Sequence, residues 1–120
     1  MRAPLSDLPL LLEDVSLRAG STLLLDHVNL RITQGPPTMI VGPNGSGKTS
    51  LLRLCMGLVR ASEGRVSWGG REDSTPGRRA FVFQRPVMLR RSAAANVDYA
   101  LAHAGVAGSD RPARIAELLD

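Results

Sequence analysis

The chain has 120 residues, 43% hydrophobic and 22% charged, so we read it as one globular domain or part of one rather than a disordered or fibrous chain. Its formal charge of +4 comes from scattered basic residues, and with only 3% aromatic residues no stacking platform for nucleic acid is expected. The single cysteine, Cys55, and the lack of a long apolar run argue against a disulfide, a signal peptide and a spanning helix. We expect a cytosolic protein whose membrane role, if any, comes through a partner.

Two alternating runs near the N-terminus predict a pair of antiparallel strands. Hydrophobic side chains alternate with polar ones at Val15 and Leu17 and again at Val28, Leu30 and Ile32. Between the runs lie residues with turn chemistry, Ala19, Gly20, Ser21 and Thr22. The apolar residues 10–12, followed by Glu13 and Asp14, are expected to belong to the first of these strands.

The next predicted elements are a buried strand, a glycine-rich loop and a helix in direct succession. Residues 38–41 are nearly all apolar, as expected of a strand buried on both faces. From Lys48 onward, hydrophobic residues recur at helical spacing at Leu51, Leu52, Cys55, Leu58 and Val59. Gly57 and residues 61–64 are expected to close the helix.

In the second half of the sequence, the patterns predict shorter strands and helices. Val66 and Trp68 indicate a strand that ends at Gly69 and Gly70, and residues 71–79 read as a polar loop. Residues 81–83 are a second candidate for a buried strand, ending at Gln84. Residues 92–104 and 112–119 have the composition of helices.

The glycine-rich loop matches the pattern G-x-x-x-x-G-K-[ST] completely, and it lies between a predicted buried strand and a helix N-terminus. By composition, a chance match has odds of about one in a thousand, and the alternative is a merely flexible turn. The loop and the next residue are Gly42, Pro43, Asn44, Gly45, Ser46, Gly47, Lys48, Thr49 and Ser50. We expect these residues to bind the phosphates of a nucleoside triphosphate, with ATP and magnesium as the preferred ligands.

The chemistry of a triphosphate explains these residue types. Gly42, Gly45 and Gly47 let backbone N–H groups approach the phosphates closely, and the positive end of the following helix stabilises their charge. Lys48 is expected to reach the β and γ phosphates, and Thr49 to offer its hydroxyl to magnesium. Lys48 is also the only lysine among fifteen basic residues, which fits a site that accepts a compact ammonium and rejects a planar guanidinium.

Beyond the loop, the sequence resembles the ATP-binding cassette (ABC) family of transporter ATPases over nearly its whole length. Residues 42–52 resemble that family's Walker A motif with its helix, and residues 63–70 the segment that follows it. Residues 81–86 resemble the Q-loop, with Asn96 and Val97 at the expected distance downstream. The resemblance implies an α/β fold, a partial P-loop NTPase core with an N-terminal antiparallel β subdomain.

By the same resemblance, Lys48 and Gln84 would be the catalytic residues, and Thr49 and Gln84 the magnesium ligands. The alternative for Gln84 is a strand-end glutamine that simply meets solvent. The region after Gln84 would bind a transmembrane permease subunit, and a second ATPase subunit would complete a dimer at the inner face of the cell membrane. The implied function is ATP hydrolysis coupled to solute transport, with import favoured.

The sequence also departs from the family pattern. The position where the family stacks an aromatic residue on adenine corresponds to Ala19, which leaves base recognition open. The signature motif, Walker B carboxylates and switch histidine have no counterpart after Asn96, and residues 10–14 precede the phosphate loop, the wrong order for a Walker B. His27 and His103 are expected to be exposed or at a strand end. We therefore read residues 1–120 as the N-terminal part of an ABC domain that binds ATP but hydrolyses it poorly.

Three functional alternatives stay open at this point. Residues 83–92 are similar to importer subunits for oxyanions such as tungstate, molybdate or phosphate. A soluble ABC-type ATPase of DNA repair, chromosome maintenance or translation can carry the same phosphate loop. A truncated, non-catalytic nucleotide-binding fragment is the third reading.

Overall fold

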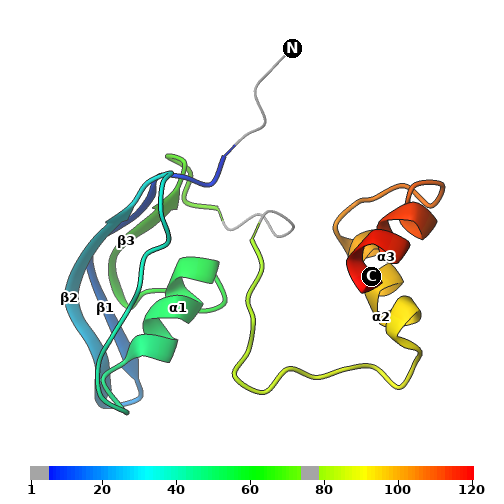
Figure 1. The fold of residues 1–120 in the computed structure, drawn as a ribbon. Helices are drawn as coiled ribbons and strands as arrows, with labels where there is room; N and C mark the ends of the chain where they lie inside the picture. The colour runs from blue at the N-terminus through cyan, green and yellow to red at the C-terminus, as the bar shows by residue number, and fades with distance from the viewer. Residues whose placement is uncertain (1–5, 74–78) are drawn as a thin grey trace. The chain divides into compact units, whose positions relative to one another are not determined.

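In the computed structural model, the described residues are 6–73 and 79–120, and they form two compact units. The first unit falls within residues 1–75 and the second within residues 76–120. The first contains three strands and one helix, and the second contains two helices (Figure 1). Each unit is described by itself.

The first unit is built on an antiparallel sheet. Strands β1 (Leu10–Ala19), β2 (Thr22–Ile32) and β3 (Glu63–Trp68) are arranged in the order β2-β1-β3. The predicted N-terminal pair and its turn are confirmed, because β1 and β2 are neighbours and Ala19 is opposite Thr22. The strand predicted around Val66 and Trp68 is also confirmed, and it begins at Glu63 rather than after the glycine at 64. The helix before this strand ends at Met56 and is capped by Gly57, so the expectation about its end was right for Gly57 and wrong for residues 61–64.

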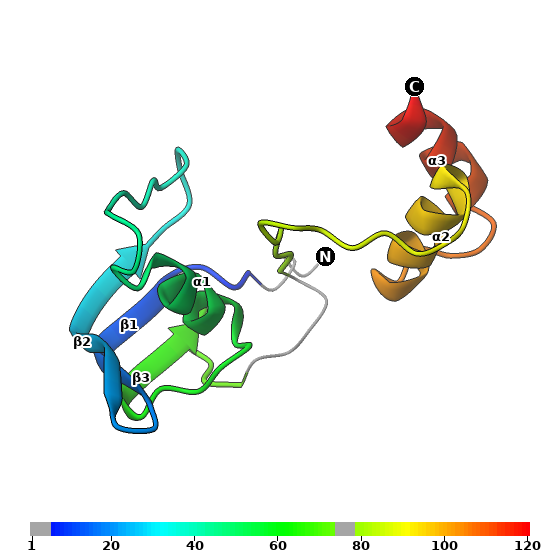
Figure 2. The ribbon, with the colours of Figure 1, turned by 90° about the horizontal axis from the view of Figure 1, so that it is seen from below.

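Helix α1 (Lys48–Met56) lies over one face of this sheet, as two views at right angles show (Figures 1 and 2). Its anchor is Leu54, which is only 1% exposed and belongs to a core with Leu12, Val15 and Trp68. The helix ends where Gly57 adopts a left-handed conformation and donates its N–H to the last turn.

The predicted apolar face of α1 needs one correction. Leu51 and Cys55 pack against the core as predicted, but Leu52 and Leu58 are exposed. Positions 51, 54 and 55 share one side of a helix, whereas position 52 lies beside it, and Leu58 comes after the helix has ended. The buried side chain that the pattern missed is Leu54.

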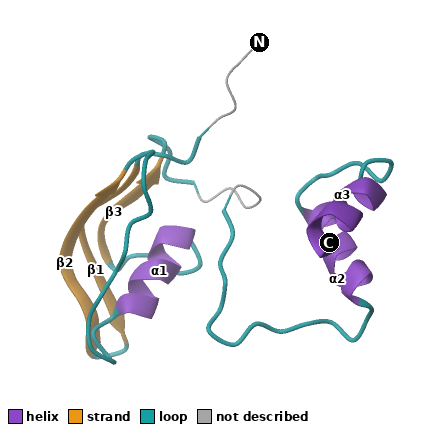
Figure 3. Ribbon diagram, in the orientation of Figure 1, coloured by secondary structure: helices purple, strands orange, loops and turns teal. Residues whose placement is uncertain are grey.

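The two predicted buried strands, residues 38–41 and 81–83, are not strands, as the colouring by secondary structure shows (Figure 3). Met39 is 85% exposed, Val41 83% and Val82 87%. A strand of a parallel sheet needs a neighbour for its hydrogen bonds. Among residues 6–73 and 79–120, the named strands are all used in the antiparallel sheet, so neither apolar segment has a strand to pair with.

The second unit is a pair of helices, α2 (Ala93–His103) and α3 (Arg111–Leu119), as the sequence predicted. Ser92 caps α2 by accepting a hydrogen bond from the backbone N–H of Ala95. The guanidinium of Arg111 lies 2.7 Å from the carboxylate of Asp98 and joins the two helices. Within the part of the chain that the structure describes, no helix is both long and apolar enough to cross a membrane.

Candidate phosphate-binding site

The predicted phosphate loop, residues 42–49, leads directly into α1. Gly45 and Gly47 have φ values of 81° and 96°, in the left-handed region that favours glycine. A Cβ on Gly42 would lie 2.9 Å from the hydroxyl of Ser46, so a side chain there would press into the loop itself. The backbone conformation therefore favours glycine at positions 45 and 47, and the space inside the loop favours it at position 42.

The side chain of Lys48 bends back over this loop. Its ammonium donates to the carbonyl oxygens of Gly42 and Pro43, at 2.5 Å and 2.7 Å, and lies 3.3 Å from the hydroxyl of Ser46. The backbone N–H of Ser46 donates to the carbonyl of Pro43, 3.2 Å away, which adds a turn within the loop. The positive charge is thus concentrated inside the curve of the loop.

The N-terminus of α1 adds further positive potential to the same place. The first helical hydrogen bond runs from the N–H of Leu51 to the carbonyl of Gly47, 2.9 Å away, so the amides of Lys48, Thr49 and Ser50 have no carbonyl of the helix to bind. The first turn carries no acidic residue, and the side chain of Thr49 is exposed. The amides of residues 48–50, the ammonium of Lys48 and the hydroxyl of Thr49 can all donate hydrogen bonds, which is what the oxygens of a phosphate group accept.

These residues also fit the magnesium that would accompany a triphosphate. In the described ranges, no three His, Cys, Asp or Glu side chains gather as ligands for a metal ion. Magnesium bound with a nucleotide needs only one or two protein ligands, because phosphate oxygens and water complete its shell. Thr49 at the helix start can supply such a ligand.

The loop rests on the sheet through Gly47. A Cβ at this position would lie 2.9 Å from the carbonyl oxygen of Leu24 and 3.0 Å from a methyl group of Leu25. Strand β2 therefore sets how the loop enters the helix, a contact that the sequence pattern did not reveal.

Gln84, the other predicted catalytic residue, belongs to the second unit. Its side chain is exposed, in an irregular segment that precedes α2. Thr49 belongs to the first unit and Gln84 to the second, and their shared role in metal binding stays a prediction.

The segment after Gln84 is fastened to α2 at one point. The amide side chain of Asn96 accepts from the N–H of Leu89 at 2.9 Å and donates to the carbonyls of Leu89 and Ser92, at 3.1 Å and 3.0 Å. We call these hydrogen bonds the Asn96 clamp. Directly before it in the sequence, Val87 is 91% exposed and Met88 67%. The clamp therefore fixes the backbone next to two exposed apolar side chains.

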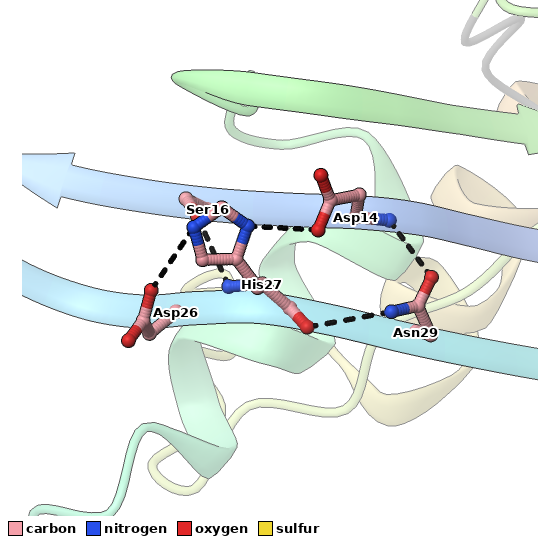
Figure 4. A network of polar contacts seen from close by, with 5 residues as sticks. All are labelled: Asp14, Ser16, Asp26, His27 and Asn29. Carbon is pink, nitrogen blue, oxygen red and sulfur yellow. Dashed lines mark hydrogen bonds and ion pairs between the residues drawn. The ribbon is translucent and has the colours of Figure 1, made fainter.

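His27 is exposed, as expected, but it is part of a polar network that sequence reasoning missed (Figure 4). Its ring lies between the carboxylates of Asp14 and Asp26, at 2.7 Å and 3.6 Å. The hydrogen bond of the ring to the carboxylate of Asp14, and then the negative charges of Asp14 and Asp26, raise the pKa of His27 above 6.5.

Residues 25–120, which contain the phosphate loop and Gln84, match the sequence pattern of the ABC transporter family. The chain belongs to this family. Among its relatives is the sulfate/thiosulfate import ATP-binding protein CysA of Nephroselmis olivacea, 38% identical over 97 residues. Another is the Fe(3+) ions import ATP-binding protein FbpC of Escherichia coli strain K12, 36% identical over 117 residues.

The matches cover most of this chain but a minor part of the ABC relatives. They include 77% and 90% of the chain, and only 28% and 32% of the lengths of CysA and FbpC. A solved structure of an ATP-binding subunit of an ABC transporter superposes with a TM-score of 0.73 at 23% identity, over 85% of this chain and 45% of that one. The fold is therefore that of part of an ABC ATPase domain, as the sequence predicted.

Proposed function

We propose that this chain is the N-terminal part of the ATP-binding subunit of an ABC transporter, which couples ATP hydrolysis to solute import. The observation that carries the proposal is the phosphate loop. Its glycines, the ammonium of Lys48 folded over it and the N-terminus of α1 that follows it belong to a chain of the ABC family. The import direction follows the names of both relatives.

In this proposal, each group of the loop has a separate task. The amides of residues 48–50 hold the phosphate oxygens, and Lys48 turns its ammonium from the loop carbonyls to the β and γ phosphates. Thr49 supplies a hydroxyl ligand to magnesium, which neutralises charge on the phosphates. The chain's contribution is positioning and electrostatic stabilisation rather than covalent chemistry.

Gln84 and the residues after it would connect the nucleotide to the membrane partner. Gln84 would contact magnesium and the attacking water, with Lys48 as the other catalytic residue. The exposed Val87 and Met88, held near the Asn96 clamp, offer an apolar surface for a permease subunit. A second ATPase subunit would complete the assembly, placed at the inner face of the cell membrane by the permease.

The exposed apolar segments support the idea that residues 1–120 are only part of an ABC domain, ending before its signature motif and Walker B. Residues 38–41 and 81–83 carry strand-like sequences yet expose Met39, Val41 and Val82. Burying them takes neighbouring strands. We expect the chain alone to bind ATP but to hydrolyse it poorly.

The transported solute is a finer question. Residues 83–92 favour an oxyanion, and one relative is named for sulfate and thiosulfate, whereas the other is named for Fe(3+) ions. We keep the oxyanion as the proposed class, and transport measured with sulfate, molybdate and Fe(3+) in the assembled system would decide it.

The direct test is binding of ATP with magnesium to the 120-residue chain by calorimetry. We expect the wild type to bind and Lys48→Ala to lose detectable binding, because the only ammonium of the loop is removed. Arg53→Ala, on an exposed position of the same helix, is the matched control and should bind like the wild type. Equal affinity of wild type and Lys48→Ala would refute the phosphate-loop assignment.

A further inference from the structure

Two irregularities face each other in the middle of the sheet. Between the pairs Leu12–Leu30 and Val15–Val28, β1 has two residues, Glu13 and Asp14, opposite one residue of β2. In the next interval, β2 has the two residues, Asp26 and His27, opposite one residue of β1. Each strand thus carries a β-bulge, and the two bulges are adjacent.

Each bulge contains one residue whose backbone conformation is unfavourable. Asp14 has a φ of 53° and His27 a φ of 47°, in the left-handed region that side chains other than glycine adopt at a cost. Such a conformation persists only where surrounding contacts determine it, and it is often found near a functional site.

Hydrogen bonds across the strands supply those contacts. The ring of His27 binds the carboxylate of Asp14 at 2.7 Å, and the backbone N–H of His27 donates to the hydroxyl of Ser16 at 3.0 Å. The N–H of Asp14 donates to the side chain of Asn29 at 2.9 Å, as Figure 4 shows. Ser16 is buried and His27 is exposed, so the bond between them is half-buried. We name the pair of bulges with these bonds the bulge clasp.

The bulge clasp is connected to the phosphate loop by two residues. Leu25 directly precedes Asp26, and a further register shift leaves Leu24 as an extra residue in β2. The carbonyl of Leu24 and the side chain of Leu25 are the atoms against which Gly47 is packed. The course of β2 through the clasp therefore decides where the loop meets the sheet.

The charged groups around His27 come from all three strands. Asp14 on β1 forms the short contact, Asp26 lies beside His27 on β2, and Glu63 on β3 adds a longer-range attraction. All three favour the protonated imidazole. The bond to Asp14 is strongest when His27 is charged, because charge-assisted hydrogen bonds are stronger than neutral ones.

We propose that His27 is a positioning residue for the phosphate loop: bound to Asp14, it fixes the bulge that holds Leu24 and Leu25 against Gly47. This inference rests on the proposed function, because it concerns the affinity of the same loop for ATP. Its consequence is that protonation of His27 strengthens ATP binding, and deprotonation at higher pH weakens it.

The test measures ATP affinity with magnesium by calorimetry at pH 6.0 and pH 8.5, on the full chain and four variants. His27→Asn and Asp14→Asn each remove one partner of the pair, and asparagine tolerates a positive φ better than most residues. His103→Gln is the matched control, because it removes the only other histidine, which lies in the second unit. Lys48→Ala tests the proposed function itself. Titration of the nucleotide is common to all and cancels in ratios between variants.

We expect the wild type to bind about threefold more tightly than His27→Asn at pH 6.0, as for an exposed ion pair, and the ratio to fall toward one at pH 8.5. Asp14→Asn should behave like His27→Asn, and it decides the question if His27→Asn does not fold by circular dichroism. The inference is overturned if the ratio of the two ATP affinities is one at pH 6.0, or if it is the same at both pH values. The proposed function still stands in that case, provided that Lys48→Ala abolishes binding. Binding unaffected by Lys48→Ala overturns both.

Discussion

Trp68 donates its indole N–H to the backbone carbonyl of Cys55, with 2.7 Å between nitrogen and oxygen. The bond joins the last residue of β3 to the last turn of α1, where carbonyl groups lack a partner within the helix. Trp68 is 5% exposed, so bond and ring are both part of the core. The sequence predicted a strand residue at this position, and in the structure Trp68 also links the sheet to the helix.

Trp68→Phe should lower the free energy of unfolding by about 1–3 kcal/mol, because the carbonyl of the half-buried Cys55 loses this donor. Urea unfolding followed by circular dichroism measures this difference. Leu58→Ala, at an exposed position just after α1, is the control and should change stability by less than about 1 kcal/mol. A Trp68→Phe variant as stable as the wild type would show that the hydrogen bond contributes nothing net.

Gly64 and Gly70 form a matched pair, because each has a φ of 82°. A Cβ on Gly64 would approach the carbonyl carbon of Asp14 at 2.6 Å, whereas one on Gly70 would meet nothing within 4 Å. Gly70→Ala should therefore cost only about 1–2 kcal/mol for the left-handed backbone. Gly64→Ala should cost about 4 kcal/mol or more, since backbone must move. Thermal unfolding of the two variants gives the comparison, and equal melting temperatures would contradict it.

Lys48→Arg conserves charge but not shape. The ammonium fits between the carbonyls of Gly42 and Pro43 and the hydroxyl of Ser46, whereas a planar guanidinium is larger and its donors diverge. We expect Lys48→Arg to bind ATP with magnesium at least about tenfold more weakly than the wild type in calorimetry. Affinity restored to the wild-type value by arginine would mean that the loop needs a positive charge and nothing more.

His27 should titrate above its ordinary pKa of 6.5, chiefly because of its hydrogen bond to Asp14. A pKa raised by folding adds stability that is fully present below pH 6.5 and is lost as the pH rises through the folded-state value. The stability difference between wild type and His27→Asn should accordingly be larger at pH 6.0 than at pH 8.5. Proton NMR of the imidazole in wild type and Asp14→Asn checks the shift directly, and the same pKa in both would rule out Asp14 as its cause.

Short-range sequence patterns correctly predicted the elements that depend mainly on residues close together in the chain. The hairpin of β1 and β2, the start of α1 at Lys48 and the helical stretch of α2 follow from alternation, periodicity and composition. The turn conformation of the phosphate loop was likewise readable, because its glycines fix it. The family followed from motifs far apart in the sequence.

The failures concern relations between distant residues. Residues 38–41 have the composition of a buried strand, but burial depends on neighbours that composition does not supply. The positive φ values of Asp14 and His27 leave no trace in the alternation of polar and apolar residues, which even suggested regular strands. Gly64 was read as the end of a helix because glycine suits both roles, and only its contact with Asp14 assigns it to β3.

The central strand of the sheet, β1, precedes both of its neighbours in the sequence. β1 needs β2 on one side and β3 on the other, and β3 ends only at Trp68. During synthesis β1 can pair with β2 at once, but its other edge stays open until the loop and α1 have emerged. β3 then closes that edge and brings the indole that donates a hydrogen bond to the last turn of α1. The candidate phosphate loop therefore leaves the ribosome before the sheet against which it packs is complete.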